Sequence, residues 1–210
     1  MTSPSRTVEV AGLSFEAVGS GDVLTGVVGP EPSKSCPAPG MPLAGLSLSD
    51  LPLGVWSHPG GDEPIFALDE PIIYVGTTRH GLHSVLLGVK EAEDGPTGLG
   101  LMRWTDEGTG ATINYHWPAR GDRPRFSWHV EEGNPAECVI TWFPLPQQVA
   151  HVDSTVDGKT VADSVRPVSR VAILSIPADV EHRLVDALAF DAGGTPILRG
   201  RSFAAPPPHG

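Results

Sequence analysis

Residues 112–130, "TINYHWPARGDRPRFSWHV", indicate the fold class of this 210-residue chain. Apolar residues alternate with polar ones on both sides of a loop that contains Gly121 and two prolines. Alternation with a period of two is typical of a half-buried strand and not of a helix. The stretch therefore predicts two antiparallel strands, 112–117 and 125–130, joined as a hairpin.

The pairing of these two strands would place four aromatic rings on one face: Tyr115, Trp117, Phe126 and Trp128. The other face would carry four polar side chains: Asn114, His116, Ser127 and His129. Two interpretations of the aromatic face are open, a core layer or an exposed platform that stacks a sugar or a partner. The core is favoured, because soluble monomers seldom expose such a patch. The next run, with Cys138, Ile140 and Trp142 alternating, would extend this layer.

The rest of the chain repeats the strand pattern, with Gly, Pro or Asp at intervals of about ten residues. The expected strands lie near residue 8 and at 13–18, 23–28, 65–68, 72–75, 84–89, 99–104, 137–143, 149–156 and 171–176. The continuous apolar run "SRVAILSIP", 169–177, predicts a strand that is buried on both faces. We therefore predict an all-β antiparallel β-sandwich with long Pro/Gly-rich loops. At most one short helix is expected, and its candidate is "PADVEHRL", 177–184.

The segment "LVDALAFDAGGTPILRGRSF", 184–203, predicts a second hairpin that turns at Asp191–Gly194. Two glycines in the turn can adopt positive φ at little cost. If Phe190 faces residue 195, Leu188 faces residue 197 and Asp186 faces Arg199. The expected result is an apolar pair followed by an ion pair on one face.

The length of the chain predicts a single domain over residues 1–210. Two stretches, 29–42 and the tail 204–210, are expected to be irregular and flexible, since their prolines remove backbone donors and favour extended chain.

The composition limits the classes of partner and compartment. A formal net charge of -11 and an isoelectric point near 5.0 oppose binding to nucleic acid or acidic membranes, because both need clustered Lys and Arg. No run approaches the about 20 apolar residues of a membrane span, and the start does not have a signal-peptide pattern. A cytoplasmic protein is expected, with Cys36 and Cys138 as free thiols.

Motifs for catalysis are absent from the sequence. No phosphate-binding loop, nucleophile elbow or paired-histidine zinc motif is present. A dispersed enzyme site remains an alternative, with metal-assisted hydrolysis through His80, His116 and His129. Two diagonal histidines are too few for a tight zinc site, so we expect no metal and no cofactor.

The loop between the two predicted strands contains the adhesion tripeptide Arg-Gly-Asp, although a turn also favours Gly and Asp beside Pro. The favoured function is a non-catalytic interaction or structural subunit that presents loops and an acidic surface to a protein partner. The candidate binding residues are Asn114, His116, Arg120, Asp122, Arg123 and His129. A glycan- or small-ligand-binding module is a further alternative, in which the aromatic face binds the ligand.

Overall fold

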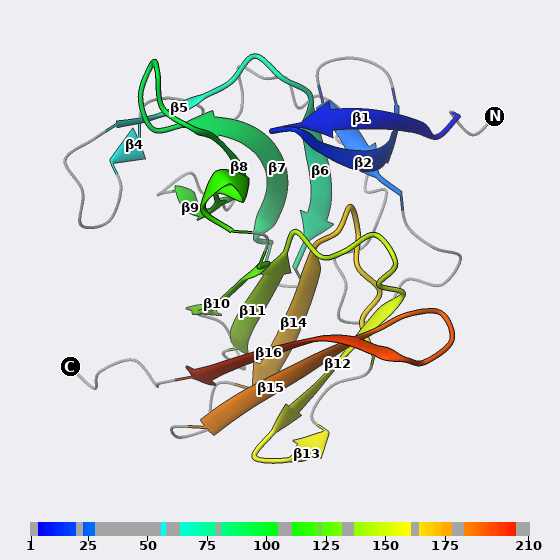
Figure 1. The fold of residues 1–210 in the computed structure, drawn as a ribbon. Helices are drawn as coiled ribbons and strands as arrows, with labels where there is room; N and C mark the ends of the chain where they lie inside the picture. The colour runs from blue at the N-terminus through cyan, green and yellow to red at the C-terminus, as the bar shows by residue number, and fades with distance from the viewer. Residues whose placement is uncertain are drawn as a thin grey trace. The chain divides into compact units, whose positions relative to one another are not determined.

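A computed structural model describes residues 4–19, 23–27, 56–57, 64–78, 81–104, 111–121, 123–131, 137–160, 164–177 and 183–204 (Figure 1). The regular secondary structure of this part is nearly all strand, and its strand pairs are antiparallel except β3 with β6. The all-β, antiparallel prediction is therefore confirmed. The sandwich itself is not clearly formed, because the described strands make three sheets of nine, three and four strands.

Helix is limited, in the described residues, to one 3-10 turn, η2 (Pro118–Arg120). The helical candidate 177–184 lies partly outside these residues, and at its ends Pro177 and Arg183 belong to strands. No helix in the described part is long and apolar enough to cross a membrane. The stretch 29–42 and residues 205–210 lie outside the described residues, while Ala204 ends the last strand.

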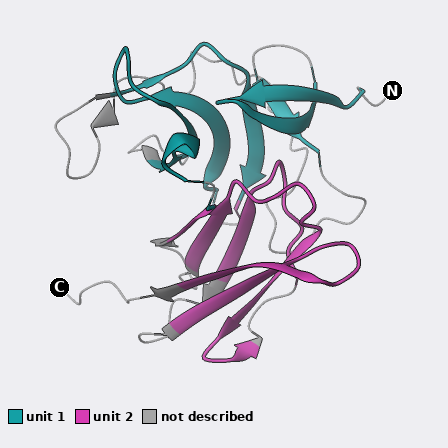
Figure 2. Cartoon of the chain, in the orientation of Figure 1, with its two compact units in different colours: residues 1–27, 39–77, 81–123 teal, residues 28–38, 78–80, 124–210 magenta. Residues whose placement is uncertain are grey.

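The chain divides into two compact units (Figure 2). Unit 1 comprises residues 1–27, 39–77 and 81–123, and unit 2 comprises residues 28–38, 78–80 and 124–210. The expectation of a single domain over 1–210 stays a prediction.

Unit 1 contains the nine-stranded sheet. Its strands are β1 (Arg6–Val10), β2 (Leu13–Val18), β3 (Val23–Gly26), β4 (Trp56–Ser57), β5 (Pro64–Ala67), β6 (Ile72–Thr77), β7 (His83–Lys90), β8 (Thr97–Trp104) and β9 (Ala111–His116). The long strand β7 is central, since β6 and then β5 pair with one edge of it and β8 pairs with the other. The hairpin partner of β9 is β8.

One face of this sheet forms a hydrophobic cluster, because every second residue along β6, β7, β8 and β9 points to the same face. The buried members are Ile65, Ile72, Tyr74, Val85, Leu87, Val89, Met102, Trp104 and Tyr115. Gly98 provides space beside this cluster, where a Cβ would overlap the ring of Trp117. A glycine in β8 therefore allows the half-buried indole to lie directly against the sheet.

Unit 2 contains the other two sheets. The three-stranded sheet consists of β10 (Arg125–Glu131), β11 (Glu137–Phe143) and β14 (Ala172–Pro177). The four-stranded sheet consists of β12 (His151–Val156), β13 (Lys159–Thr160), β15 (Arg183–Phe190) and β16 (Pro196–Ala204). Buried residues alternate with exposed or half-buried ones along β12 and β15, whereas Ala172, Ile173 and Leu174 of β14 are all buried. The prediction that 169–177 includes a strand buried on both faces is confirmed.

An aromatic contact joins β10 and β11 in unit 2. Phe126 pairs with Trp142, and their rings meet edge to face with centroids 5.5 Å apart. The Phe126 ring also lies against Gly200 of β16, where a Cβ would come within 2.6 Å of it. Residues 138, 140 and 142 do extend the layer begun by β10, as the sequence predicts.

The predicted hairpin of 112–117 with 125–130 is wrong. Strand β9 pairs with β8 and strand β10 pairs with β11, so the two segments belong to different sheets and different units. Each of the two segments pairs over its whole length with its other neighbour in sequence. The loop that joins the two segments contains two prolines, which have no backbone N–H to donate to a hairpin. The four rings therefore do not form one face of a hairpin.

The buried indole at position 142 gives a test of the packing in unit 2. We expect Trp142→Ala to lower the free energy of unfolding by about 3 to 5 kcal/mol, the usual loss for a buried aromatic side chain. The control is Phe66→Ala, since Phe66 is 41% exposed and surface changes stay within about 0.5 kcal/mol. Denaturant unfolding followed by circular dichroism measures both, and equal stabilities would contradict this packing.

Candidate functional site

The predicted site residues are not brought together by a hairpin. Asn114 and His116 lie in β9, where His116 is only 7% exposed and pairs with Leu99. His129 lies in β10 and its side chain, like the whole of Asp122, is outside the described residues. The histidine pair that could have shared a ligand is therefore not formed by strand pairing. His80 also lies outside the described residues. Among the described residues, no group of three or more His, Cys, Asp or Glu side chains is placed to bind a metal ion.

Two contacts anchor Arg120, whose side chain is the one that the structure describes in the Arg-Gly-Asp tripeptide. Its Nη2 lies 2.5 Å from Oε2 of Glu91, and its Cζ lies 5.4 Å from the centre of the Trp117 ring. Trp117 in turn stacks on Tyr115, with ring centroids 5.9 Å apart. Arg120 is 58% exposed, and Arg123 is exposed as well. The turn thus has exposed arginines, but Arg120 is held against the sheet by the ring beneath it.

Tyr115 is the inner end of this stack. Burial raises the pKa of its phenol to about 12, because the phenolate loses its hydration. The hydroxyl is therefore neutral at physiological pH, and the residue packs in the core. Of the two rings of this stretch that lie in unit 1, Tyr115 is buried in the core and Trp117 packs half-buried against it.

A group of charged and apolar side chains in unit 2 forms a more open candidate site. It lies on the face of β12, β15 and β16 opposite the buried alternate residues of that sheet. We call it the arginine face, and its members are His151, Asp153, Asp186, Leu188, Phe190, Arg199 and Arg201. Asp153 of β12 faces Leu188 and is the second carboxylate of this face. Strand register brings them together, since Asp186 pairs with Arg201, Leu188 with Arg199 and His151 with Phe190.

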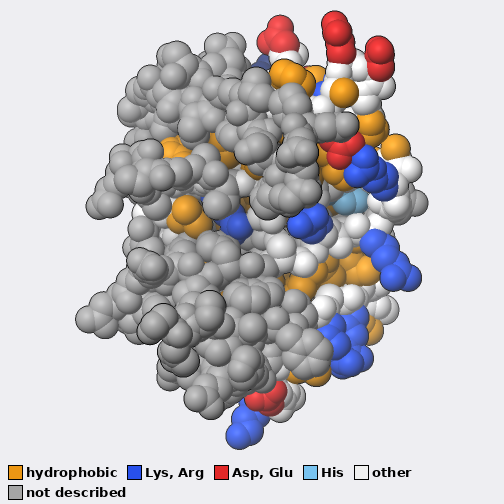
Figure 3. Space-filling model, turned by 90° about the vertical axis from the view of Figure 1, so that its left-hand side faces the viewer, with side chains coloured by type: hydrophobic (Ala, Val, Ile, Leu, Met, Phe, Trp, Pro, Cys, Tyr) orange, Lys and Arg blue, Asp and Glu red, His pale blue; other side chains and the backbone are white. Residues whose placement is uncertain are grey.

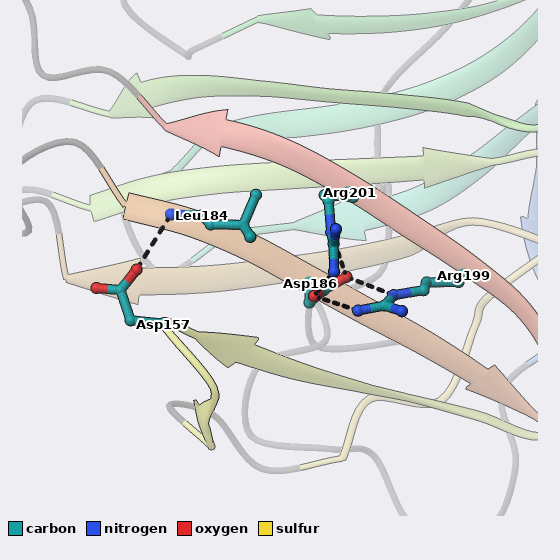
Figure 4. Close-up of polar contacts among 5 residues, drawn as sticks. All are labelled: Asp157, Leu184, Asp186, Arg199 and Arg201. Atoms are coloured by element: carbon teal, nitrogen blue, oxygen red, sulfur yellow. Dashed lines mark hydrogen bonds and ion pairs between the residues drawn. The ribbon is translucent and has the colours of Figure 1, made fainter.

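The carboxylate of Asp186 joins both arginines (Figure 4). Its Oδ1 accepts from Nε of Arg199 at 2.7 Å and from Nε of Arg201 at 3.2 Å. Its Oδ2 accepts from Nη2 of the same residues at 2.6 Å and 2.8 Å. Four donors match the about four lone-pair sites of a carboxylate, so its acceptor capacity is used.

These bonds also determine the protonation of the cluster. Hydrogen bonds from Arg199 and then Arg201 hold the pKa of Asp186 well below its usual range, and the same contact raises the pKa of Arg199. Carboxylates and guanidiniums are charged at neutral pH, so Asp186 with the two arginines leaves one surplus positive charge in the cluster. Each guanidinium has five N–H donors and gives two to Asp186, so three on each remain for another acceptor.

Apolar side chains continue the face next to the charges. Leu188 is 37% exposed, and the rings of His151 and Phe190 stack in parallel with centroids 4.9 Å apart. Arg199 and Arg201 are 57% and 51% exposed. Figure 3 shows Lys and Arg side chains next to hydrophobic ones at the surface of the described part. The face can thus offer hydrogen bonds and apolar contact at neighbouring positions.

Two aspartates fix the ends of β15, on which the face is built. Asp157 has φ of 50° in the turn after β12, and its Oδ1 accepts from the backbone N–H of Leu184 at 3.3 Å (Figure 4). Asp191 follows β15, and its Oδ1 accepts from the N–H groups of Gly193 and Thr195 at 2.9 and 2.8 Å. Side chains of this kind replace backbone partners in tight turns. The strand that carries Asp186 and Leu188 is therefore held at both ends.

The sequence contained part of this site. The predicted turn at Asp191–Gly194 and the contact of Asp186 with Arg199 are confirmed. The predicted register is wrong by two residues, because Phe190 faces Pro196 and not residue 195, and a shift between Ala189 and Phe190 adds a second residue. Arg201, not Arg199, therefore lies opposite Asp186. Arg199 still reaches Asp186 diagonally. The role of Arg201 was missed, although the spacing of two in Arg-Gly-Arg places both arginines on one face.

A second polar cluster lies in unit 1, where β6 is followed by β7. Oγ1 of Thr77 lies 2.8 Å from Nδ1 of His83 and also contacts the hydroxyl of Tyr74. His83 stacks on Trp104 with centroids 5.3 Å apart. A hydroxyl hydrogen-bonded to an imidazole is the contact that activates a nucleophile.

Comparisons with protein-family models, curated proteins and solved structures found no match to this chain.

The lowered pKa of Asp186 gives a test with a defined sign. The unfolded carboxyl titrates near 3.9 and the folded one lower, so its ionic contribution is complete above the unfolded value and declines as the pH falls below it. We expect the difference in unfolding free energy between the parent and Asp186→Asn to be constant from about pH 8 to 5 and to shrink below about pH 4. Asp94→Asn, at an exposed turn, is the control. A difference that changes between pH 5 and 8 would contradict the cluster.

Cys138 gives a test of burial in β11. The thiol is free and 3% exposed, and burial raises its pKa to about 11. In a Cys36→Ser variant, we expect a disulfide reagent at pH 8 to modify Cys138 only after unfolding, because the thiolate is the reactive form. Full modification of the folded protein within seconds would show that the thiol is accessible.

Proposed function

We propose that this chain is a non-catalytic protein that binds a protein partner through the arginine face of unit 2. The observation that carries the proposal is the exposed Leu188 beside two arginines that one carboxylate already holds in place. This surface differs from the acidic surface expected from net charge alone, since the cluster of Asp186 with its two arginines has a net positive charge.

The composition of the face supports binding. Arginine and aromatic residues are enriched at protein interfaces and frequent among the side chains that dominate their affinity. Here Arg199 and Arg201 lie beside Leu188 and the stacked ring of Phe190. A partner can therefore bury apolar area at Leu188 while it accepts hydrogen bonds from the arginines.

The fixed geometry of the arginines also supports binding. Ordering a long flexible side chain at an interface costs about 0.5–1.5 kcal/mol. Asp186 already orders both guanidiniums, each through two hydrogen bonds. Binding of a partner therefore costs less conformational entropy at these two side chains.

The proposal is tested by capture of partners from the native cell with the tagged full-length chain. We expect a protein to copurify with the parent and to be lost with Leu188→Ser and with Arg201→Ser, while the melting temperature stays nearly unchanged. The matched control is Phe66→Ser, because Phe66 is a similarly exposed apolar residue of unit 1. Equal capture by all four proteins would reject the arginine face as the interface.

Hydrolysis is a second candidate function, favoured by the hydrogen bond between Thr77 and His83. In such a reaction His83 would accept the hydroxyl proton as Thr77 attacks the carbonyl carbon of an ester, and would return it to the departing alcohol; water would then release the acyl group from Thr77. A fluorophosphonate probe tests it. Labelling of the parent that is lost in both Thr77→Val and His83→Asn would support hydrolysis, and absence of labelling in the parent would reject this reactivity.

A further inference from the structure

We infer that the arginine face binds an extended, carboxylate-bearing segment of a protein, with an acidic side chain on Arg199 and Arg201 and an apolar side chain on Leu188. This inference rests on the proposed function and specifies the chemistry of the partner. Its basis is the charge, donor geometry and spacing of the cluster around Asp186.

The charge of the cluster matches one carboxylate. Two guanidiniums and the Asp186 carboxylate leave one surplus positive charge within this cluster, and Asp153, opposite Leu188 on β12, adds a negative charge on the other side of Leu188. A carboxylate carries a single negative charge, whereas a phosphate monoester carries about -1.5 to -2 at neutral pH. The larger negative charge would lie next to Asp186 and be repelled by it. Net charge -11 on the whole chain further opposes nucleic acid and anionic lipid surfaces.

The free donors also suit a carboxylate. Arg199 and Arg201 both donate to Asp186 through Nε and Nη2, so Nη1 and the second N–H of Nη2 remain on each. This pair of N–H groups at the end of a guanidinium can bind both oxygens of a carboxylate. Because the fork is already oriented, the second carboxylate is bound at a lower entropic cost.

The spacing of the face suits an extended segment. Asp186 and Leu188 are two residues apart on β15, as are Arg201 and Arg199 on β16, and the pairs Asp186–Arg201 and Leu188–Arg199 are successive on the same face. Side chains two apart on an extended chain also share one face, about 6.6 Å from each other. A partner with an acidic residue and an apolar residue two positions apart can therefore reach both parts of the face.

The test is an NMR titration of the full-length chain with the capped peptide SESLS, in which Glu and Leu are two positions apart. We expect the backbone signals of β15 and β16 to shift, and the affinity to fall at least tenfold when Gln replaces Glu in the peptide. Arg199→Ser and Arg201→Ser should each weaken binding by a similar factor. The matched control is Arg6→Ser, an exposed arginine of β1, which should bind as the parent does.

Three results would overturn the inference: no binding of the Glu peptide, equal affinity for the Gln peptide, or tighter binding of a peptide with phosphoserine in place of Glu. The last result would identify a phosphate-binding surface instead. If the peptide fails but Leu188→Ser still abolishes partner capture, the inference alone is rejected. If the peptide binds but capture does not depend on Leu188 or Arg201, the proposed function is rejected.

Discussion

The carboxylate of Asp186 is the interaction on which the functional account depends. It accepts four hydrogen bonds from two arginines of the adjacent strand. Exposed ion pairs contribute little to stability when they are isolated, because two flexible side chains must be ordered for one contact. Here a single carboxylate orders two guanidiniums, and their remaining donors form part of an exposed face. The cluster is thus better suited to organising a surface than to stabilising the fold.

The sheets provide the rigid support that such a surface needs. Asp157 and Asp191 fix the backbone at the two ends of β15, and the alternate residues Val185, Ala187 and Ala189 are buried beneath it. Close contacts between strands and rings depend on glycine, as at Gly200 under Phe126 and at Gly98 under Trp117. Both contacts bring an aromatic ring to the backbone, which a larger residue would prevent.

The sequence predicted the strands better than their partners. Period-two alternation identified most strands, and a continuous apolar run identified the strand buried on both faces, because these properties depend on local burial. Pairing across residues 117–124 was wrong, since nothing local in "NYHW" or "FSWHV" indicates that each pairs with its other neighbour in sequence. The turn at Asp191–Gly194 was predictable from two glycines after an aspartate. The length of the turn and the shift at Ala189 and Phe190 were not, and together they decide which arginine faces Asp186.

The most direct test of the central claim is the hydrogen exchange of the arginine Nε–H groups in the full-length protein, measured by NMR without any partner. Both Nε–H groups donate to Asp186, so the account predicts slow exchange for Arg199 and Arg201 compared with Arg6, and loss of this protection in Asp186→Asn. Exchange as fast as that of Arg6 in the parent protein would mean that Asp186 does not hold the two arginines. The arginine face would then not be organised in advance of binding.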